Sequence, residues 1–520
     1  MTRKSIEPAV YAPLSGQAYG SALSMADEGA GREGRPELAD VGRLLRRGVS
    51  GVVGAARAGQ RETLSGLLRA HLGPSVDEQD IVEESWAGYE HVNVQAGLEA
   101  WLSAGSRSSE LVGVIGFQHQ PFGLADLLEA SGGPQDAYGP RPGNVARTHL
   151  ASGPGGQVMA CVRCGLYLVQ EGERRLAVLL RGAEPDQGMT RVSIQVASSD
   201  PGTAGPAAQL IRELASRHNV FRNQVLSFGA EVFGHGETLM QFHERPAVTA
   251  EQVVLAPEVA QAVHRQVVEI ARHKDRLLQA GQHLKRGLLL YGPPGVGKTH
   301  LVRHLTSGLT ETTVIQLTGN ALHLIGEACS VARSLQPAML VVEDVDLIAE
   351  DRGMHPGQHP LLFQLLNEMD GLAEDADVVF VLTTNRADLL EPALAARPGR
   401  IDQAVELALP DAGARRALIE LYRGPMSVDG SRMDEVIQST AGVTASFLKE
   451  LLRRSALFAA EREPAGGSLA VTADDLDAAL AELLDTRNAM TRVLLGGSAG
   501  DPSPADLAIG STDAIGSTHH

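Results

Sequence analysis

The chain has few of the features that mark secreted, membrane-spanning or nucleic-acid-binding proteins. Its 520 residues include 3 cysteines, too few for a disulfide framework, which favours a reducing compartment. No apolar run approaches the roughly 20 residues of a membrane helix, and the amino terminus lacks the apolar core of a signal peptide. A net charge of −18 disfavours a surface dedicated to nucleic acid or anionic lipid. We therefore expect a cytoplasmic protein that has neither a membrane nor nucleic acid as its partner.

Both ends of the chain differ in composition from its centre. Residues 1–35 are rich in Gly, Ala, Ser and charge without apolar periodicity, which predicts a mobile arm. Residues 488–520 are rich in Gly, Ser and Asp and repeat the sequence Ala-Ile-Gly-Ser-Thr, which predicts a disordered tail. We attach no function to the tail.

The segment 36–77 predicts helices, and the segment 78–233 predicts a mixed domain. From Pro36 to Leu72, apolar residues recur at helical spacing in two blocks, so we expect two amphipathic helices. Their apolar stripes fit a small bundle or, alternatively, a surface that grips a partner or substrate. Strand and helix patterns are interleaved over 78–233, which predicts an α+β amino-terminal domain that binds the client or partner.

Within 78–233 we expect a helical stretch that includes Trp86, Tyr89 and Trp101, and a hairpin over 158–180. The hairpin carries Cys161-Val162-Arg163-Cys164. A zinc site needs four ligands, and no second pair of Cys or His follows at suitable spacing. On an extended strand, residues three apart point to opposite faces, which separates the thiols. We interpret these cysteines as structural, with redox or metal chemistry as the alternative.

The most informative pattern is a glycine-rich loop between an apolar strand, Gly287–Tyr291, and a helical pattern. The spacing G-x-x-x-x-G-K-[ST] wraps a polyphosphate with inward-turned backbone N–H groups and the positive end of a helix. Lys298 then reaches the β and γ phosphates of ATP, and the Thr299 hydroxyl binds Mg²⁺. The nucleotide-binding set comprises Gly292, Pro293, Pro294, Gly295, Val296, Gly297, Lys298, Thr299 and His300.

Later strands end in polar residues that suit ATP chemistry. The apolar strand 338–342 ends at Glu343 and Asp344, carboxylates that either hold the Mg²⁺ shell and polarise water or cap the next helix. The strand 378–382 leads to Asn385, which either orients an attacking water or forms a turn. Arg397 and Arg400 follow in a turn, either solvated or projecting into the phosphate site of a neighbouring subunit.

Together these blocks resemble the AAA family of P-loop ATPases over residues 250–487. Leu365–Leu372 resembles the family segment that signals between subunits, and residues 383–402 resemble its second region of homology. The resemblance implies an α/β fold, in which a P-loop NTPase parallel sheet flanked by helices occupies 234–410 and a small helical lid occupies 411–487. It also implies ATP and Mg²⁺ as cofactors and a homo-oligomeric ring, usually a hexamer, because arginine fingers act across an interface.

The resemblance assigns roles to single residues. It implies that Glu343 supports the Mg²⁺ shell through water, that Asp344 is the catalytic base and that Asn385 is the sensor 1 residue. Arg397 and Arg400 are then arginine fingers that act in trans.

Three departures from the family pattern bear on activity. The order at 343–344 is Glu-Asp where the family has Asp-Glu, which we expect to slow hydrolysis without abolishing it. The pore loop reads Leu324-Ile325-Gly326 and lacks an aromatic residue, which disfavours processive unfolding. In the lid, Ala445 replaces the second Gly of the turn near the adenine.

From these patterns we expect an ATP-hydrolysing AAA ring that remodels or disassembles a protein client selected by its amino-terminal domains. The alternative is a nucleotide-gated assembly scaffold with little hydrolysis, which the Glu-Asp order and the weak pore loop favour. A DNA-remodelling ring is disfavoured by the acidic balance of the chain.

Overall fold

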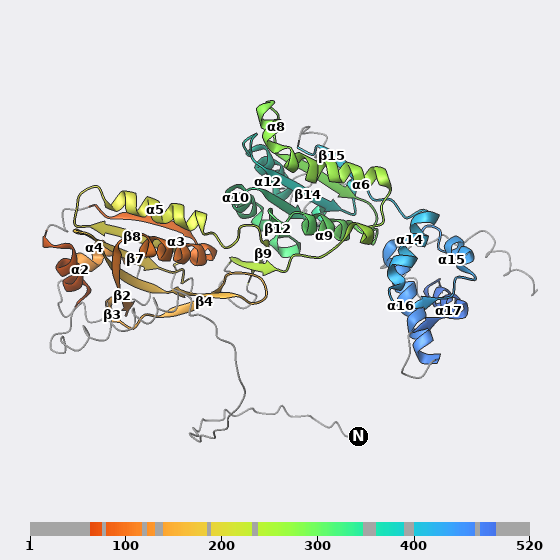
Figure 1. The fold of residues 1–520 in the computed structure, drawn as a ribbon, viewed down its shortest axis with the longest axis horizontal. Helices are drawn as coiled ribbons and strands as arrows, with labels where there is room; N and C mark the ends of the chain where they lie inside the picture. Colours follow the sequence, from red (N-terminus) through yellow and green to blue (C-terminus); the bar gives the residue numbers. More distant parts are fainter. Residues whose placement is uncertain are drawn as a thin grey trace, which may run out of the picture. The chain divides into compact units, whose positions relative to one another are not determined.

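The computed structural model describes residues 63–74, 80–116, 122–129, 139–184, 189–230, 238–346, 360–388, 400–462 and 469–484. These residues form an α+β amino-terminal domain, a central domain with a mostly parallel sheet, and a small helical unit (Figure 1). The predicted arm at 1–35, the first of the two predicted helices in 36–77 and the predicted tail at 488–520 lie outside the described residues.

The amino-terminal domain is built on a six-stranded antiparallel sheet in the order β1-β8-β7-β6-β2-β3. A separate hairpin pairs β4 with β5. The strands are β1 (Val82–Ala87), β2 (Arg107–Ile115), β3 (Arg141–Gly143), β4 (Arg147–Ala151), β5 (Val158–Val162), β6 (Cys164–Glu171), β7 (Arg174–Arg181) and β8 (Arg191–Ser198).

Helices cover both faces of this sheet, because alternate residues of its central strands are apolar on each side. Val178 of β7 packs in the same cluster as α3 (His91–Ser103) and α5 (Ala204–Arg217). The neighbouring Leu179 packs in the cluster of α2 (Leu64–Leu72) and α4 (Leu124–Glu129). Figure 1 shows α3 and α5 over one face of the sheet, and the two helices are in contact.

The second predicted helix of the 36–77 segment is present as α2. Leu64, Leu68 and Leu72 are buried in the core of the amino-terminal domain, so its apolar stripe serves packing within the chain. The predicted helical stretch around the aromatic residues is wrong in part. Trp86 lies in strand β1, opposite Val192 of β8, and Tyr89 lies in a 3-10 turn over Gly88–Glu90, whereas Trp101 is helical as expected.

The two hairpin cysteines lie in different strands of different sheets. The extended chain is interrupted at Arg163, so Cys161 lies in β5 and Cys164 is the first residue of β6. Both side chains are buried, and burial raises the pKa of each thiol to about 12. In the described part of the chain, no group of three or more His, Cys, Asp or Glu residues could hold a metal ion. The burial and the raised pKa of both thiols agree with structural cysteines.

The central domain has a seven-stranded sheet in the order β10-β9-β12-β13-β14-β11-β15. All neighbours pair in parallel except the hairpin of β9 and β10. The strands are β9 (Val225–Ala230), β10 (Thr238–His243), β11 (Arg286–Tyr291), β12 (Thr313–Leu317), β13 (Ala338–Val342), β14 (Val378–Thr384) and β15 (Gln403–Glu406). The expected central strands are therefore confirmed within a few residues.

Both faces of this parallel sheet are covered by helices, which explains why its strands are continuous apolar runs. One face packs against α10 (Ile325–Ser334) and α12 (Pro360–Asp370). The other packs against α9 (Lys298–Gly308) and the helical segment that begins with α6 (Pro257–His264). That segment continues through a π-helical turn (Arg265–Glu269), α7 (Ile270–Arg272) and α8 (Lys274–Gln279).

The predicted boundary between 233 and 234 falls inside this sheet. β9 precedes it and β10 follows it, and the two strands pair with one another. β9 also pairs in parallel with β12. The central domain therefore begins at Val225, because β9 forms the hydrogen bonds along the side of β12 that faces away from β13.

The carboxyl-terminal helical unit lies within residues 411–487, which the sequence predicts to form a helical lid. It contains α14 (Ala412–Arg423), α15 (Met433–Ser439), α16 (Ala445–Arg462) and α17 (Ala473–Leu484), with a two-stranded parallel ladder of β16 (Ser427–Val428) and β17 (Ala470–Val471). Asp411 begins the unit as the N-cap of α14, accepting a hydrogen bond from the backbone N–H of Ala414 at 2.7 Å.

We expect the 3 cysteines, all of them buried, to be unreactive toward an aromatic disulfide reagent at pH 8 in the native protein. The reason is that the thiolate is the reactive form and burial raises the pKa of each thiol to about 12. The measurement is thiol release before and after unfolding in urea. Rapid native labelling of Cys161 or Cys164 would instead support redox chemistry.

Candidate functional site

The loop between β11 and α9 has the backbone that its glycines predict. Gly292 and Gly297 have positive φ angles of 147° and 106°, and Gly297 is the left-handed N-cap of α9. A Cβ on Gly292 would collide with the carbonyl oxygen of Leu407. Because only glycine adopts this path without strain, the loop can present its backbone N–H groups at the start of a helix.

Lys298 is the centre of the site. Its side chain is buried, with 7% exposure, and its ammonium group donates hydrogen bonds to the carbonyl oxygens of Gly292 at 2.7 Å and Pro293 at 3.0 Å. A third bond reaches Asn385 Oδ1 at 2.8 Å. Burial lowers the pKa of Lys298, and the charges of Asp344 and Asp346 oppose that shift. The structure thus brings the loop lysine to the predicted strand-end asparagine.

The two predicted carboxylates follow β13 and differ in their surroundings. The Thr299 side chain is near enough to the Glu343 carboxyl to lower its pKa, so the two residues predicted to hold Mg²⁺ lie close together. Burial and the nearby charge of Asp344 raise the pKa of the Glu343 carboxyl. A divalent cation would lower it again, because an opposite charge favours the ionised form.

Asp344 has an unusual backbone conformation. Its φ is +51°, in the left-handed region, and its backbone N–H donates to Thr383 Oγ1 at 3.2 Å. Asn385 Nδ2 donates to Asp344 Oδ1 at 3.3 Å. Asp and Asn tolerate this region better than other residues with a Cβ. The carboxylate therefore lies against the same amide that contacts Lys298.

Asp346 is a site residue that the sequence reasoning did not select. Its side chain is 8% exposed, and Oδ1 accepts hydrogen bonds from Thr384 Oγ1 at 2.9 Å and from the backbone N–H of Asn385 at 3.3 Å. The available signal was the third acid in the run Glu343-Asp344-Val345-Asp346, at the carboxyl end of a buried strand.

The predicted arginine fingers do not join this cluster. Arg397 lies outside the described residues. Arg400 is 11% exposed in its side chain and forms an ion pair with Asp370 at the end of α12. It precedes β15, whereas the phosphate loop follows β11, and these strands are parallel. Arg400 therefore lies at the amino-terminal ends of these strands, whereas Lys298 of the same chain lies at their carboxyl-terminal ends.

The remaining loop residues have individual surroundings. Pro294 is exposed, and Val296 packs against the apolar cluster under α9. The His300 ring nitrogen Nε2 is bonded to the carbonyl oxygen of Gln252 at 2.9 Å, so this side chain binds the segment before α6. Of residues 292–297, only Pro294 is exposed.

The predicted pore-loop tripeptide belongs to the core. Leu324 ends a 3-10 turn (Gly319–Leu324) and is 9% exposed, and Ile325 begins α10 and is 0% exposed. Both pack in the apolar cluster on one face of the sheet. Because their side chains are buried, they cannot grip a polypeptide. The sequence predicted only that this loop lacks an aromatic residue.

The helical unit touches the phosphate loop through the first turn of α16. The Ser446 backbone N–H donates to the carbonyl oxygen of Gly295 at 3.1 Å. A Cβ on Gly295 would lie 3.0 Å from the side-chain oxygens of Thr444 and Ser446. Ala445, the residue that departs from the family pattern, is buried at the start of α16. The turn therefore approaches the loop despite the substitution.

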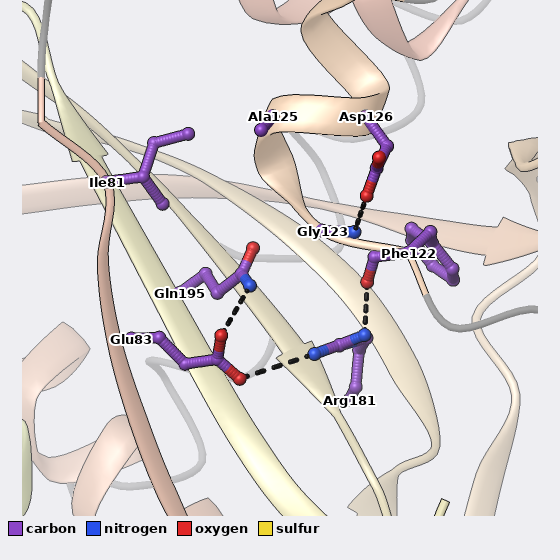
Figure 2. Close-up of a pocket in the computed structure, with 8 residues that line it drawn as sticks. All are labelled: Ile81, Glu83, Phe122, Gly123, Ala125, Asp126, Arg181 and Gln195. Carbon is purple, nitrogen blue, oxygen red and sulfur yellow. Dashed lines mark hydrogen bonds and ion pairs between the residues drawn. The ribbon is translucent and has the colours of Figure 1, made fainter. Parts of the chain in front are cut away.

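A separate cavity of about 360 Å³ lies in the amino-terminal domain (Figure 2). Glu83 accepts a hydrogen bond from Gln195 Nε2 at 2.9 Å and pairs with Arg181, which also donates to the carbonyl oxygen of Phe122. Its lining residues are Ile81, Glu83, Phe122, Gly123, Ala125, Asp126, Arg181 and Gln195. The polar groups bond one another across β1, β7 and β8, which indicates a structural network.

Comparison with known proteins identifies the central domain. Residues 288–409 match the model of the ATPase family associated with various cellular activities (AAA). This part of the chain is an AAA domain. Its P-loop NTPase fold is the α/β fold expected from the sequence, and the family uses ATP with Mg²⁺. The glycine backbone, the buried Lys298 and the proximity of Thr299 to Glu343 fit such a ligand.

Curated relatives share this domain. The chain is 35% identical over 226 residues to ATP-dependent zinc metalloprotease FtsH 2 of Sphaerobacter thermophilus, covering 41% of this chain and 34% of that protein. It is 30% identical over 292 residues to ATP-dependent zinc metalloprotease FtsH 2 of Sorangium cellulosum, covering 53% and 47%. The chain spans between about a third and a half of the length of the curated relatives it matches. Of the helices within the described ranges, none is long and apolar enough to cross a bilayer.

The left-handed backbone at Asp344 predicts an unusual order of stability. The variant Asp344→Gly should be more stable than Asp344→Ala by about 1 kcal/mol, because a left-handed conformation costs a residue with a Cβ roughly 1–2 kcal/mol. Both variants lose the same carboxylate, so the comparison isolates the backbone. The measurement is urea unfolding.

The matched pair at Asp477, inside α17, should show the reverse order, since glycine within a helix costs about 0.5–1 kcal/mol relative to alanine. An equal stability of the Gly and Ala variants at 344 would contradict the positive φ.

Proposed function

We propose that this chain hydrolyses ATP at the cluster of Lys298, Glu343, Asp344 and Asn385. The observation that carries the proposal is the pair of contacts made by Asn385, to Lys298 Nζ at 2.8 Å and to Asp344 Oδ1 at 3.3 Å. One amide thereby links the phosphate-binding lysine to a carboxylate suited to act as a base. Such a link is the geometry needed to align a water with a phosphoryl group.

Each residue has one role in this proposal. The loop glycines and Lys298 bind the phosphates, Thr299 and Glu343 hold Mg²⁺, with Glu343 acting through water, and bound Mg²⁺ neutralises charge on the phosphates. Asp344 accepts the proton of the water, and Asn385 orients that water. His300 acts indirectly, by fixing the segment around Gln252 beside the loop.

The proposed machine is a homo-oligomeric ring, a hexamer, in which Arg397 and Arg400 complete the site of the neighbouring subunit. The support is geometric: Arg400 is at the wrong edge of its own sheet to reach its own Lys298. A guanidinium supplied in trans neutralises the charge that develops on the phosphates.

The proposed substrate class is protein. The relatives are named proteases, and we infer that the AAA ring remodels or disassembles a protein client selected by the amino-terminal domain at 78–233, in the cytoplasm. The buried Leu324 and Ile325 favour brief remodelling over processive threading, since threading requires exposed side chains that grip the polypeptide.

The second candidate function is a nucleotide-gated scaffold with little hydrolysis. The reversed Glu-Asp order at 343–344 favours it, together with the burial of Leu324 and Ile325 in the predicted pore loop. Steady-state turnover of ATP with Mg²⁺ decides between the two candidates, because the scaffold would assemble with ATP and release almost no phosphate.

We expect Lys298→Ala to weaken nucleotide binding by about 10- to 100-fold, since a hydrogen bond to a charged group contributes roughly 1.5–3 kcal/mol. Binding is measured with a fluorescent nucleotide.

Asp344→Asn should retain nucleotide binding and lose turnover by at least about 100-fold, measured by phosphate release. Normal turnover by Asp344→Asn would remove Asp344 from the role of base. With ATP bound, the Asp344→Asn variant should also retain its protein client, which can be captured; the same variant with ADP is the control.

Mixing two inactive variants tests action in trans. Arg400→Ala and Asp344→Asn chains should each be inactive, whereas a 1:1 mixture should regain activity at roughly a quarter of its interfaces, as expected for a closed ring with head-to-tail contacts. The active interface joins an intact Asp344 on one chain to an intact Arg400 on the next.

Arg272→Ala, which removes an exposed arginine paired within α7 and its neighbouring turn, is the control and should not alter turnover. A mixture that stays inactive although both chains enter one ring would place Arg400 outside the mechanism.

A further inference from the structure

Beside the four residues of the proposed site, a fifth side chain is enclosed at the same edge of the sheet. Asp346 Oδ1 accepts two hydrogen bonds, one from the Thr384 hydroxyl at 2.9 Å and one from the Asn385 backbone N–H at 3.3 Å. Thr384 is fully buried, and its oxygen accepts in turn from the Arg386 backbone N–H at 2.9 Å. One carboxylate oxygen of Asp346 therefore holds the turn that follows β14 through two hydrogen bonds.

This turn carries the amide on which the proposed chemistry depends. The Asn385 backbone is bound to Asp346, while its side chain contacts Lys298 and Asp344. If Asp346 Oδ1 were removed, the Thr384 hydroxyl and the Asn385 N–H would both lose their acceptor, and the turn could rotate. A displacement of about 1 Å at a catalytic group can reduce a rate by roughly 100-fold.

We propose that Asp346 is a positioning residue that holds Asn385 in the orientation needed for ATP hydrolysis, acting through its acceptor oxygen. This inference rests on the proposed function, because it assigns Asp346 to the same site. We assign Asp346 neither the Mg²⁺ role nor the base role, because its side chain is buried and its Oδ1 accepts two hydrogen bonds, whereas Asp344 is exposed.

The variants separate the acceptor oxygen from the charge. Asp346→Asn keeps an Oδ1 that can accept from Thr384 and Asn385, and should retain turnover within about 3-fold of the unaltered chain. Asp346→Ala removes the acceptor and should lower kcat by roughly 10- to 100-fold, with the affinity for ADP within about 3-fold. Thr384→Val removes the hydroxyl at nearly constant volume and should behave like Asp346→Ala. Equal losses in Asp346→Asn and Asp346→Ala would overturn the proposal.

A double-mutant cycle tests whether Asp346 acts through Asn385. In an Asn385→Ala background, Asp346→Ala should change kcat by less than about 3-fold, because the group that it positions is already gone. If Asp346→Ala reduces kcat by the same factor in both backgrounds, the two residues act independently and the proposal fails.

The matched control is Asp475 in the helical unit. It has the same 8% exposure and accepts hydrogen bonds from the Thr472 hydroxyl at 2.8 Å and backbone N–H at 2.9 Å. Asp475 also pairs with Arg462 at 2.9 Å. Asp475→Ala should therefore lower the unfolding temperature at least as much as Asp346→Ala and leave kcat within about 3-fold, since it removes a buried carboxylate away from Asn385. If Asp475→Ala lowered kcat as much as Asp346→Ala does, the loss at Asp346 would be explained by general destabilisation, and the proposal would fail.

A binding measurement keeps this inference distinct from the proposed hydrolysis. The ratio of affinities for ATPγS and ADP reports contact with the terminal phosphate group, and Asp346→Ala and Asn385→Ala should lower it by the same factor, about 10-fold. An unaltered chain that binds ATPγS and Mg²⁺ but releases no phosphate from ATP would refute hydrolysis, while the ratio would still test Asp346. An unchanged ratio in Asp346→Ala would refute the positioning role.

Discussion

The position of β14 between β11 and β13 is the constraint on which the candidate site depends. Because the three strands are parallel, their carboxyl ends meet at one edge of the sheet. The phosphate loop, the acidic run and the turn at Asn385 each follow one of these strands. Residues 298, 344 and 385, widely spaced in the sequence, therefore come within hydrogen-bond distance. The continuous apolar strands bury both faces of this sheet against helices.

The polar groups at this edge satisfy one another in a mostly enclosed setting. The three hydrogen bonds of Lys298 match its three donors, and the carboxylate of Asp346 serves two donors. A phosphate group must therefore compete with the carbonyl oxygens of Gly292 and Pro293 for the lysine. The affinity for nucleotide therefore depends on how much stronger the bonds of Lys298 to phosphate are than its bonds to these carbonyl oxygens.

Local patterns were sufficient for most of the sheet and insufficient for the details of the site. The bounds of β13 were predicted from its apolar run alone, and the phosphate loop from its spacing. The left-handed backbone of Asp344 and the role of Asp346 depend on contacts with Thr383 and Thr384 some forty residues later, which one sequence does not reveal. Trp86 was misplaced because strand pairing with β8 overrides a local helical pattern.

The hairpin of β9 and β10 has a practical consequence for dissecting this chain. β9 saturates the outer edge of β12, and it lies before the stretch that sequence similarity assigns to the AAA domain. A fragment cut at the start of the recognisable domain would leave the backbone groups of β12 that pair with β9 unsatisfied. Such an unpaired strand edge is a template for intermolecular strand addition, so a shortened protein would misassociate for reasons unrelated to its ring.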